Sequence, residues 1–536
     1  MPSPVRLLGW LCIAIISVVG SSPAWAGPTQ PPDLGVMRAT PEDTEELLVF
    51  LEPGADAQRF AREHGLKVKH ALRSSPNIFV LSADSAKAAR QLHDTHRLGG
   101  HARAVYLNQR TRYVRMAFVP NDPYFHKNTP STGWPGQWHL VNEYVSGLDA
   151  RVQGAWNRDI TGSGAIIGIV DDSLEAAHPD LSPNYISADS WDFGQNDGDP
   201  SPVYTDDKHG VSTSGVAGAR GGNGIGVTGA APYAGLAGLR VDFVYQTTQM
   251  FVDATLYHSS GTNTNIKVKN HSYGLTDPYI LTSSEVSALS TSTSAGTIHC
   301  FAAGNESDDC NTRDLQKSPD SITVAAMGSN GKYSSYTNFG ACVTVTAPSS
   351  SSGYFGIITT DRTGTGGYNG PDSFPDTDYT AAFGGTSSAT PLVAGVMALG
   401  KQAQPALNTR FAKHVLALTS DIVDPGDTSQ QSGGGWITNA AGYHFNANYG
   451  FGLVDADQFT SVAAQYEDVS ALTTEDSGTV IVNASVPDNS TTGVSRSFIL
   501  SSTTTLEEVL VYVKATHTKR GDLEAWLTSP SGTTGR

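Results

Sequence analysis

The sequence predicts an α/β protein built on a parallel β-sheet, with a small α/β unit before it and an all-β segment after it. Between about residues 150 and 460, continuous apolar runs alternate with candidate helices, which is typical of parallel strands buried on both faces. Shorter strands and helices alternate within 44–92. After residue 464 the helical signals fade, and β-rich runs lie at 480–482 and 509–513. At about 150 residues per domain, a chain of 536 residues has room for three or four domains.

The first 26 residues are typical of a secretory signal peptide. One basic residue, Arg6, precedes an apolar run at 7–20 that is too short to span a bilayer comfortably, and Ala24-Trp25-Ala26 resembles a cleavage site. The alternative is an uncleaved membrane anchor. We therefore expect a secreted protein, extracellular or periplasmic in a Gram-negative host, with no membrane partner after signal removal.

Residues 27–115 form the small unit that precedes the parallel sheet. They carry 13 Lys and Arg against 10 Asp and Glu, whereas residues 116–536 carry 20 against 41. The net charge of −17 argues against nucleic acid as a partner and favours cationic partners or metal cations. A basic stretch at 110–115 is a place where the chain could be cleaved. The expected elements of the unit are strands at 47–51 and 77–81 and helices at 55–65 and 83–92.

Three side chains capable of chemistry lie in the parallel-sheet region. Asp171 directly follows an apolar run, at the carboxyl end of a strand, where reactive groups gather in an open α/β sheet. His209 precedes a run of small residues suited to a closely packed helix. Ser387 lies at the expected start of a helix, with Pro391 in the first turn, where its missing N–H costs little and the helix dipole favours an oxyanion. The expected strands lie at 165–170, 234–241, 266–272, 297–303 and 322–326, and helices at 248–257 and 391–399.

Each of these three residues also has an ordinary structural interpretation. A serine at a helix start is usually an N-cap, a histidine in a Gly-rich turn is usually structural, and an aspartate after a strand often caps a loop. Their order favours catalysis, because Asp, His and Ser follow one another with separations of 38 and 178 residues. Subtilisin has the same order, whereas chymotrypsin and the α/β-hydrolases have different ones.

The segments around the three residues resemble the subtilisin family, and more closely its kexin/furin branch, the proprotein convertases. The resemblance covers about 120–536. It implies a subtilisin-like parallel-sheet catalytic domain at 116–465, a propeptide at 27–115 and an all-β, jelly-roll-like P domain at 466–536 that looks truncated. The matching segments are GTSSATP at 385–391, Asp171-Asp172, AHPDL at 177–181, YGFGLVDA at 449–456 and, for the P domain, THTKRGDL at 516–523 with SPSG at 529–532.

The resemblance implies a catalytic triad of Asp171, His209 and Ser387. A hydroxyl is a poor nucleophile unless its proton is removed as it attacks, and a histidine of near-neutral pKa can take that proton and return it to the leaving amine. Asp171 would orient the imidazole and stabilise its cation. Asn305 matches the oxyanion-hole asparagine, whose side-chain N–H would contribute roughly 3–4 kcal/mol. Without the triad, Asn305 would be interpreted as part of a turn-forming Gly-Asn pair.

Acidic residues near the triad imply a preference for basic substrates. Asp172, Asp206 and Asp207 lie next to Asp171 and His209 in the sequence. They match convertase positions that contact a basic residue one place upstream of the cleaved residue. Asp277 matches a carboxylate of the primary specificity pocket, Asp314 is a candidate for a second one, and Tyr273 stands where the family has a tryptophan. Any single carboxylate in so acidic a protein could instead be merely solvated. The predicted substrate contacts are Asp172, Asp206, Asp207, Ser272, Tyr273, Gly274, Asp277 and Asp314.

Calcium is the implied cofactor. The predicted site combines two carboxylates with an amide oxygen and main-chain carbonyls of the glycine-rich loop 221–227, and calcium prefers such hard oxygen ligands. The alternative is that this loop is a glycine-rich turn without an ion. A second site would use Asp277 and Asp308, but Gly340 stands where the convertases supply a glutamate, so we doubt that site. The predicted ligands of the first site are Asp122, Asp180, Gly221, Asn223, Ile225 and Val227.

The four cysteines leave room for one internal disulfide. Cys12 falls within the signal segment, so three cysteines remain, and three allow at most one bridge. The resemblance implies that the bridge joins Cys310 and Cys342. Cys300 would then be a spare thiol on a buried strand.

Taken together, the resemblance implies a secreted, calcium-dependent serine endopeptidase made as a zymogen. It would cleave after Lys or Arg with a dibasic preference, bind protein and peptide substrates with basic residues, and be inhibited and chaperoned by its own propeptide as a monomer. The first alternative is a broad-specificity protease of the subtilisin type. The second is a non-catalytic subtilisin-like module that binds a partner, which the presence of all four catalytic positions disfavours.

Overall fold

The computed structural model describes two compact units of the chain. They fall within residues 23–115 and from residue 116 onward. The signal segment, residues 111–115 of the basic stretch and most of the 516–523 motif lie outside the described residues. The structure describes residues 42–94, 101–110, 118–129, 131, 133–275, 277–369, 374–487, 493–500, 506–516 and 523–535.

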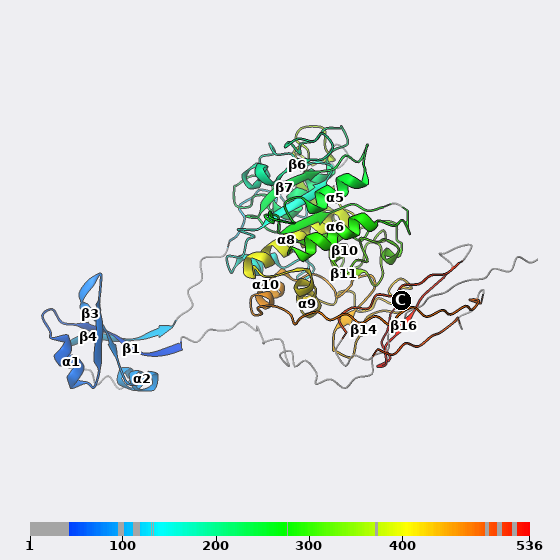
Figure 1. The fold of residues 1–536 in the computed structure, drawn as a ribbon. Helices are drawn as coiled ribbons and strands as arrows, with labels where there is room; N and C mark the ends of the chain where they lie inside the picture. The colour runs from blue at the N-terminus through cyan, green and yellow to red at the C-terminus, as the bar shows by residue number, and fades with distance from the viewer. Residues whose placement is uncertain are drawn as a thin grey trace, which may run out of the picture. The chain divides into compact units, whose positions relative to one another are not determined.

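The smaller unit is a four-stranded antiparallel sheet with two helices, in the order β2-β3-β1-β4 (Figure 1). Alternate residues of β1, Leu47, Val49 and Leu51, are buried in the same core as Phe60 of α1 and Ala89 of α2. The sequence analysis missed β2 and β4; β2 is mostly exposed and lacks an apolar pattern. The elements are β1 (Glu42–Leu51), α1 (Ala57–Glu63), β2 (Lys67–Leu72), β3 (Ser75–Ser82), α2 (Ala86–Asp94) and β4 (Ala102–Arg110).

The larger unit is built on the predicted parallel sheet. Its seven strands run in the order β11-β10-β9-β8-β5-β7-β6, and every neighbouring pair is parallel. All five predicted strands are present, which confirms the α/β fold class. The strands are β5 (Ile166–Asp171), β6 (Trp191–Asp192), β7 (Gly235–Arg240), β8 (Val268–His271), β9 (Ile298–Ala302), β10 (Ser321–Met327) and β11 (Val343–Pro348).

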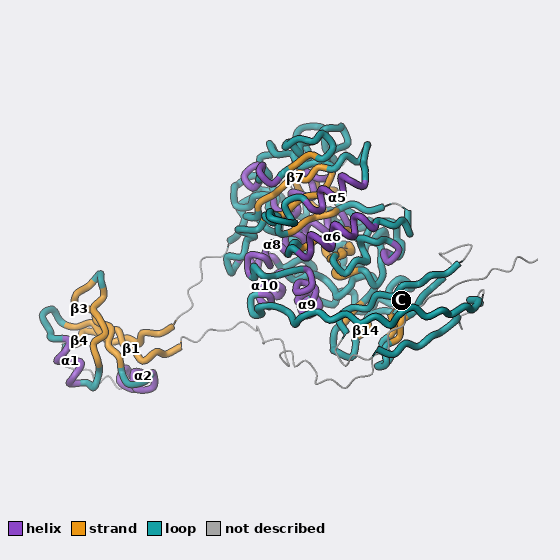
Figure 2. The backbone as a smooth tube through the Cα atoms, viewed as in Figure 1, coloured by secondary structure: helices purple, strands orange, loops and turns teal. Residues whose placement is uncertain are grey.

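Helices cover both faces of this sheet (Figures 1 and 2). Val268 of β8 and Cys300 of β9 are buried in one core with the apolar residues of α8. Lys269 and His299, their neighbours along the strands, point to the opposite face and bond to residues at the end of α5 and on α6. The helices are α3 (Val152–Trp156), α4 (His209–Gly218), α5 (Thr248–Leu256), α6 (Ser283–Ser294), α8 (Thr386–Ala403), α9 (Thr409–Thr419) and α10 (Ala456–Ala463).

After α10 the chain shows little regular structure within its described residues (Figure 2). The described strands there are β16 (Leu527–Thr528) and β17 (Thr534–Gly535), which pair with each other, and the predicted all-β P domain is not confirmed. The segment is joined to α9 by an ion pair from Arg410 to Glu507 and by a contact of His414 with the same carboxylate. None of the described helices is both long and apolar enough to cross a membrane. The remaining elements are the short strands β12 (Ile357–Thr360), β13 (Tyr379–Phe383), β14 (Ile437–Thr438) and β15 (His444–Phe445), and 3-10 turns at Ser182–Asn184, Ser187–Asp189 and Cys310–Thr312.

Candidate active site

The end of β5 and the start of α4 bring Asp171 and His209 together. His209 Nδ1 lies 2.9 Å from Asp171 Oδ1 and 3.1 Å from Oδ2. Thr213, one turn further along α4, donates its hydroxyl to Asp171 Oδ2 at 3.1 Å. With Nδ1 held by the carboxylate, Nε2 is the nitrogen left to act as a base. The sequence analysis missed Thr213, although its i+4 spacing from His209 places both residues on one face of a helix.

Asp172, a predicted substrate contact, lies at the start of α4 and bonds to backbone N–H groups there. Its Oδ2 accepts from the backbone N–H groups of Lys208 (3.1 Å) and His209 (3.0 Å). Its Oδ1 accepts from the N–H of Gly210 (2.7 Å) and the hydroxyl of Ser173 (2.8 Å). These four bonds saturate the buried carboxylate and satisfy amides that a helix start leaves without partners. Asp172 therefore holds the backbone of His209 at the start of α4.

The charge around His209 favours its cation. Burial opposes protonation, but the charge and hydrogen bond of Asp171 and the charge of Asp172 outweigh it and raise the pKa of His209 to about 9. The imidazole side chain is still 27% exposed, so solvent screens part of this effect. The histidine is therefore a stronger base than a free imidazole.

The pH dependence of catalysis should show this raised pKa. Only the neutral imidazole accepts a proton, so kcat/KM should rise with pH through the pKa of His209. We expect the midpoint of the acid limb above the ordinary 6.5 and no higher than about 9. Asp172→Asn removes one of the charges that raise the pKa and should move the limb to lower pH. A wild-type midpoint at or below 6.5 would show that Asp171 and Asp172 do not raise the pKa of His209.

Ser387 is the second residue of α8 and is tied to Ser272. Pro391 is the sixth residue of α8, so the expectation that it lies in the first turn is wrong. Because proline has no N–H, the carbonyl of Ser387 four residues earlier lacks its helical partner. That carbonyl accepts instead from the hydroxyl of Ser272 at 3.1 Å, while the Ser387 hydroxyl donates to the Ser272 carbonyl at 3.3 Å. Within the described part of the chain, the Ser387 hydroxyl makes no hydrogen bond to His209, and such bonds often tighten only when substrate is bound.

Asn305 lies beside the residue before Ser387, as the oxyanion assignment requires. Its Oδ1 accepts from the backbone N–H (2.8 Å) and the hydroxyl (3.1 Å) of Thr386. With Oδ1 engaged, the Nδ2 hydrogens are left unpaired among the described residues. The N–H of Ser387 at the start of α8 likewise has no acceptor there. Two donors thus remain for a developing oxyanion.

The segment 272–274 presents an open backbone edge next to Ser387. It continues β8 without being part of the strand, and Gly274 is exposed. Among the residues that the structure describes, no hydrogen bond uses the backbone N–H or C=O of Gly274. An extended segment with unpaired backbone groups can take up a peptide as an added strand. The structure thus gathers Ser272, Tyr273 and Gly274 at the candidate site.

Two further predicted substrate carboxylates, Asp207 and Asp314, already have partners inside the protein. Asp207 is buried and accepts from Arg240 Nη2 at 2.9 Å and from the backbone N–H of Tyr204 at 3.0 Å. Asp314 accepts from the N–H of Thr282, which precedes α6, at 3.0 Å, and pairs with Lys317 at 2.8 Å.

Two predicted carboxylates remain exposed. They are Asp206, just before α4, and Asp277, at the end of the segment that contains Gly274. Both are therefore open to a substrate cation.

Arg313 lies behind this region, and the sequence analysis did not single it out. Its guanidinium pairs with Glu306 at 3.2 Å and Asp308 at 3.4 Å, and its Nε donates to the carbonyl of Leu275 at 3.2 Å. Only 3% of the side chain is exposed. Arg313 therefore joins the two segments that flank Ser387 and offsets acidic charge next to Asn305. A lone arginine four residues after the Asp308-Asp309 pair was the available sequence signal.

The predicted calcium loop gathers its two carboxylates. Asp122 accepts from the N–H of Gly222 (2.8 Å), and Asp180 accepts from the N–H of Val227 (2.8 Å) and the amide of Asn223 (2.8 Å). Both carboxylates are buried, and neither has a salt bridge within the described residues. Burial, and next the hydrogen bonds and the charge of Asp122, set the pKa of Asp180, which is raised to about 7. Two buried carboxylates without a counter-charge suit a divalent cation, so these residues fit calcium.

The cysteines follow the sequence analysis. A disulfide joins Cys310 to Cys342, and Cys300 is a buried free thiol. The carboxylate of Asp308 is held by Arg313. The described residues contain no cluster of three or more His, Cys, Asp or Glu arranged for a metal.

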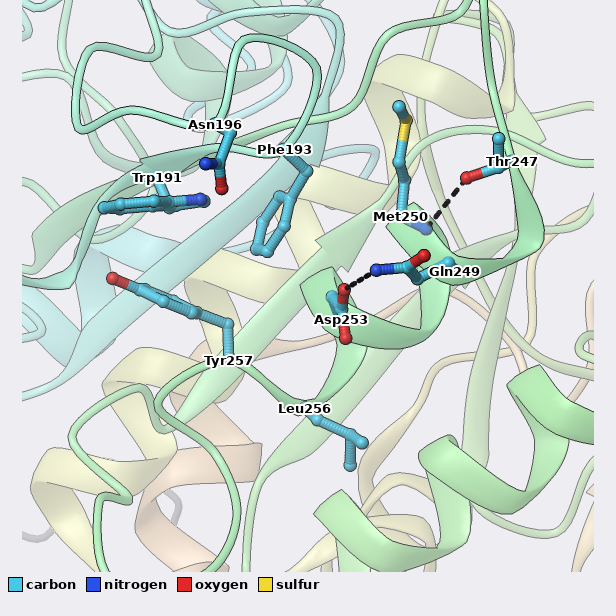
Figure 3. A pocket seen from close by; sticks show the side chains of 9 residues that line it. All are labelled: Trp191, Phe193, Asn196, Thr247, Gln249, Met250, Asp253, Leu256 and Tyr257. Carbon is cyan, nitrogen blue, oxygen red and sulfur yellow. Dashed lines mark hydrogen bonds between the residues drawn. The ribbon is translucent and has the colours of Figure 1, made fainter.

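A surface depression lies away from these residues (Figure 3). It measures about 610 Å³ and is formed by the rings of Trp191, Phe193 and Tyr257 beside α5. It includes none of the predicted site residues.

A parallel sheet that carries an Asp–His pair and a serine at the start of a central helix defines a subtilisin-like protein. The chain belongs to the subtilase family, whose family model matches residues 162–452, and to its kexin/furin branch. It is 31% identical to the "Dibasic-processing endoprotease" of Schizosaccharomyces pombe, over 77% of this chain and 57% of the relative. It is also 31% identical to "Neuroendocrine convertase 2" of Drosophila melanogaster, over 78% of this chain and 64% of the relative.

Solved structures agree with this fold. The serine protease of Aeromonas sobria in complex with its chaperone has a TM-score of 0.58 and 25% identity, covering 68% of this chain and 70% of that one. The same protease without the chaperone has a TM-score of 0.57 and 27% identity, over 67% of this chain and 70% of that one. The chain spans little more than half the length of the first curated relatives it matches.

Proposed function

We propose that the protein is a calcium-dependent serine endopeptidase that cleaves after basic residues. The observation that carries the proposal is the Asp171–His209 hydrogen bond at the carboxyl end of β5, in a protein that places Ser387 in the first turn of α8. The exposed backbone of Gly274 supports a peptide substrate, because it can pair with an extended chain. The non-catalytic alternative gives no reason for unpaired donors on both Asn305 and Ser387.

The reaction is an acyl transfer in two halves. Ser387 Oγ attacks the peptide carbonyl while His209 Nε2 takes its proton, and the C=O pair becomes an oxyanion. The Ser387 N–H and the Asn305 amide stabilise that charge. Collapse breaks the C–N bond, and the amine leaves with the proton from His209. Water, activated by the same imidazole, then hydrolyses the acyl-enzyme and restores the serine.

The exposed carboxylates support a basic substrate. Asp277 continues the segment that would bind the residue before the cleaved bond, and Asp206 precedes His209 on the other side. One of the relatives named above is called a dibasic-processing endoprotease. We therefore assign the primary basic residue to Asp277 and a second, upstream basic residue to Asp206. Broad specificity remains the alternative that the next experiment tests.

Asp277→Asn should lower kcat/KM for substrates cleaved after Lys or Arg by roughly 100-fold, because losing one partner of a desolvated charge pair costs about 2–5 kcal/mol. The same variant should change cleavage after Leu or Phe less than threefold. Asp206→Asn should mainly reduce the preference for a second basic residue. Asp253→Asn, on the exposed face of α5, is the matched control. Equal losses on basic and apolar substrates would make Asp277 structural and favour broad specificity.

The proposed calcium ion would bind between Asp122, Asp180 and the 221–227 loop, supplying positive charge that holds these segments together. It adds stability as RT ln(1 + [Ca²⁺]/Kd), about 2.7 kcal/mol at a hundredfold excess over Kd. EDTA should therefore lower the melting temperature of wild type, while Asp180→Asn should melt low with or without calcium. Asp149→Asn, which alters another buried carboxylate, should keep the calcium response. Wild type that is metal-free by elemental analysis but melts unchanged would refute the site.

We propose in addition that residues 27–115 are a propeptide of an exported zymogen. These residues carry a net positive charge, whereas the rest of the chain carries a net negative charge. The basic stretch at 110–115 also contains the residues after which the proposed enzyme would cleave. N-terminal sequencing of secreted wild type beside Ser387→Ala tests this. A new start near residue 115 only in wild type supports self-processing, and the same start in both excludes it.

A further inference from the structure

We infer that Tyr273 is a positioning residue for the substrate-binding segment, held in place by a one-way chain of buried hydrogen bonds. The inference rests on the proposed function, because it takes 272–274 as the segment that binds the peptide backbone. The chain runs on the face of the sheet that α5 and α6 cover, opposite the face packed by α8.

The chain links side chains from two strands and a helix and ends on a backbone carbonyl. His271 and His299 lie on the neighbouring strands β8 and β9, and Ser292 lies on α6. Each contact is within hydrogen-bond distance. The links are Tyr273 Oη to His271 Nδ1 (2.9 Å), His271 Nε2 to His299 Nδ1 (3.0 Å), His299 Nε2 to Ser292 Oγ (2.8 Å), Ser292 Oγ to Ser259 Oγ (2.9 Å) and Ser259 Oγ to the Thr255 carbonyl (2.8 Å).

Both imidazoles in the chain are neutral. His271 and His299 are fully buried, and burial, together with the neighbouring Lys269, holds their pKa values well below the usual range. Lys269 itself is buried and donates to the carbonyls of Ala254 and Tyr257 at the end of α5. A neutral imidazole has one donor and one acceptor nitrogen. Each histidine therefore accepts a hydrogen bond from one neighbour and donates one to the other.

The carbonyl end fixes the direction of the first links. The carbonyl of Thr255 can only accept, so Ser259 uses its single hydrogen there. Ser259 therefore accepts from Ser292, and Ser292, having donated its hydrogen, accepts in turn. The donor to Ser292 must be the Nε2–H of His299.

The remaining links follow from the neutral tautomers. His299 carries its hydrogen on Nε2, so its Nδ1 accepts from the Nε2–H of His271. His271 Nδ1 then has no hydrogen and accepts from the hydroxyl of Tyr273. The direction requires the tyrosine to stay protonated, and burial, with the charges of Asp171 and Glu285, raises the pKa of Tyr273.

The chain anchors the backbone that meets Ser387. The ring of Tyr273 packs against Phe251 at 5.0 Å and Phe243 at 5.8 Å between centroids, and only its hydroxyl end is directional. Tyr273 lies between Ser272, which holds the Ser387 carbonyl, and Gly274, whose backbone is open to a peptide. Fixing the side chain of Tyr273 therefore fixes the backbone of its two neighbours, Ser272 and Gly274.

The test compares Tyr273→Phe with Tyr449→Phe. Both remove the hydroxyl of a half-buried or buried tyrosine, but Tyr449 bonds to the backbone N–H of Tyr333, away from Ser387. For Tyr273→Phe we expect KM to rise about five- to tenfold, the effect of one lost hydrogen bond, with kcat within twofold of wild type. For Tyr449→Phe we expect the melting temperature to fall with KM unchanged. An unchanged KM in Tyr273→Phe, or an equal rise in both variants, overturns the inference.

Imidazole ¹⁵N spectra of the whole protein test the chain without relying on any variant's folding. His271 and His299 should both show the Nε2–H tautomer, unchanged between pH 5 and pH 9. An Nδ1–H tautomer at either residue, or titration in that range, overturns the chain. The two proposals fail separately: wild type that cleaves no peptide refutes the proposed function, whereas active wild type with a normal Tyr273→Phe refutes only the positioning role.

Discussion

Ser387→Ala is expected to lower kcat for peptide cleavage about a million-fold, the loss that removing the nucleophile causes in subtilisin. The expected size follows from the role proposed for Ser387, which lies at the start of α8 next to Thr386, the residue that bonds to Asn305. A residual rate above uncatalysed hydrolysis should persist, since oxyanion donors and substrate binding remain. Steady-state and single-turnover assays on a basic peptide measure the effect.

The neighbouring serine is the matched control for this variant. Ser388 also lies in the first turn of α8, but its hydroxyl bonds to Ser349 at 2.7 Å and to the Gly385 carbonyl at 3.3 Å. Ser388→Ala should keep kcat within about tenfold of wild type, at some cost in stability. Comparable losses in the two variants would show that the helix start matters only structurally.

Asn305→Asp and Asn305→Ala are each expected to lower kcat about 10²–10³-fold with little change in KM. The aspartate keeps the acceptor that holds the N–H of Thr386, but it replaces the amide donor with an oxygen that repels the oxyanion. The alanine removes both. A loss in the aspartate variant at least as large as in the alanine variant identifies the donor, rather than the contact with Thr386, as the catalytic element.

The opposite order would change the assignment. If Asn305→Asp were nearly as active as wild type, the amide nitrogen would have no role in the transition state. Asn305 would then be a residue that holds Thr386 in place, and the N–H of Ser387 would be the remaining oxyanion donor.

The sequence predicted the elements whose signals are local. Strands buried on both faces appear as continuous apolar runs, and β5 and β8 to β10 were located within a few residues. Edge strand β6 has only two residues, too few for any periodic pattern. Pro391 was misplaced within α8 because the helix begins at Thr386, and a helix start is set by the chain around it.

The candidate site was predicted in part, for the same reason. Asp171, His209 and Ser387 stand in short motifs, so their roles could be inferred before the fold was known. Whether a carboxylate is open to substrate depends on distant segments. Asp207 is engaged by Arg240, 33 residues away, and Asp314 by the N–H of Thr282, 32 residues away. No local pattern reveals such partners.

The same limit applies to the buried polar groups. The His271–His299 contact joins residues 28 positions apart on neighbouring strands, and two histidines inside apolar runs look like interruptions in the sequence. Arg313 likewise gains its meaning from Leu275, 38 residues earlier. These contacts become visible only when the strand order is known.

The most direct test of the central claim is active-site labelling of processed wild type with a fluorophosphonate, followed by peptide mapping. The account predicts one covalent label, on Ser387, that is lost in Ser387→Ala and is strongly slowed in His209→Ala, because the reagent reacts only with a serine activated by a base. Absence of label on Ser387 in correctly folded, calcium-loaded protein, or label on another serine, would contradict it.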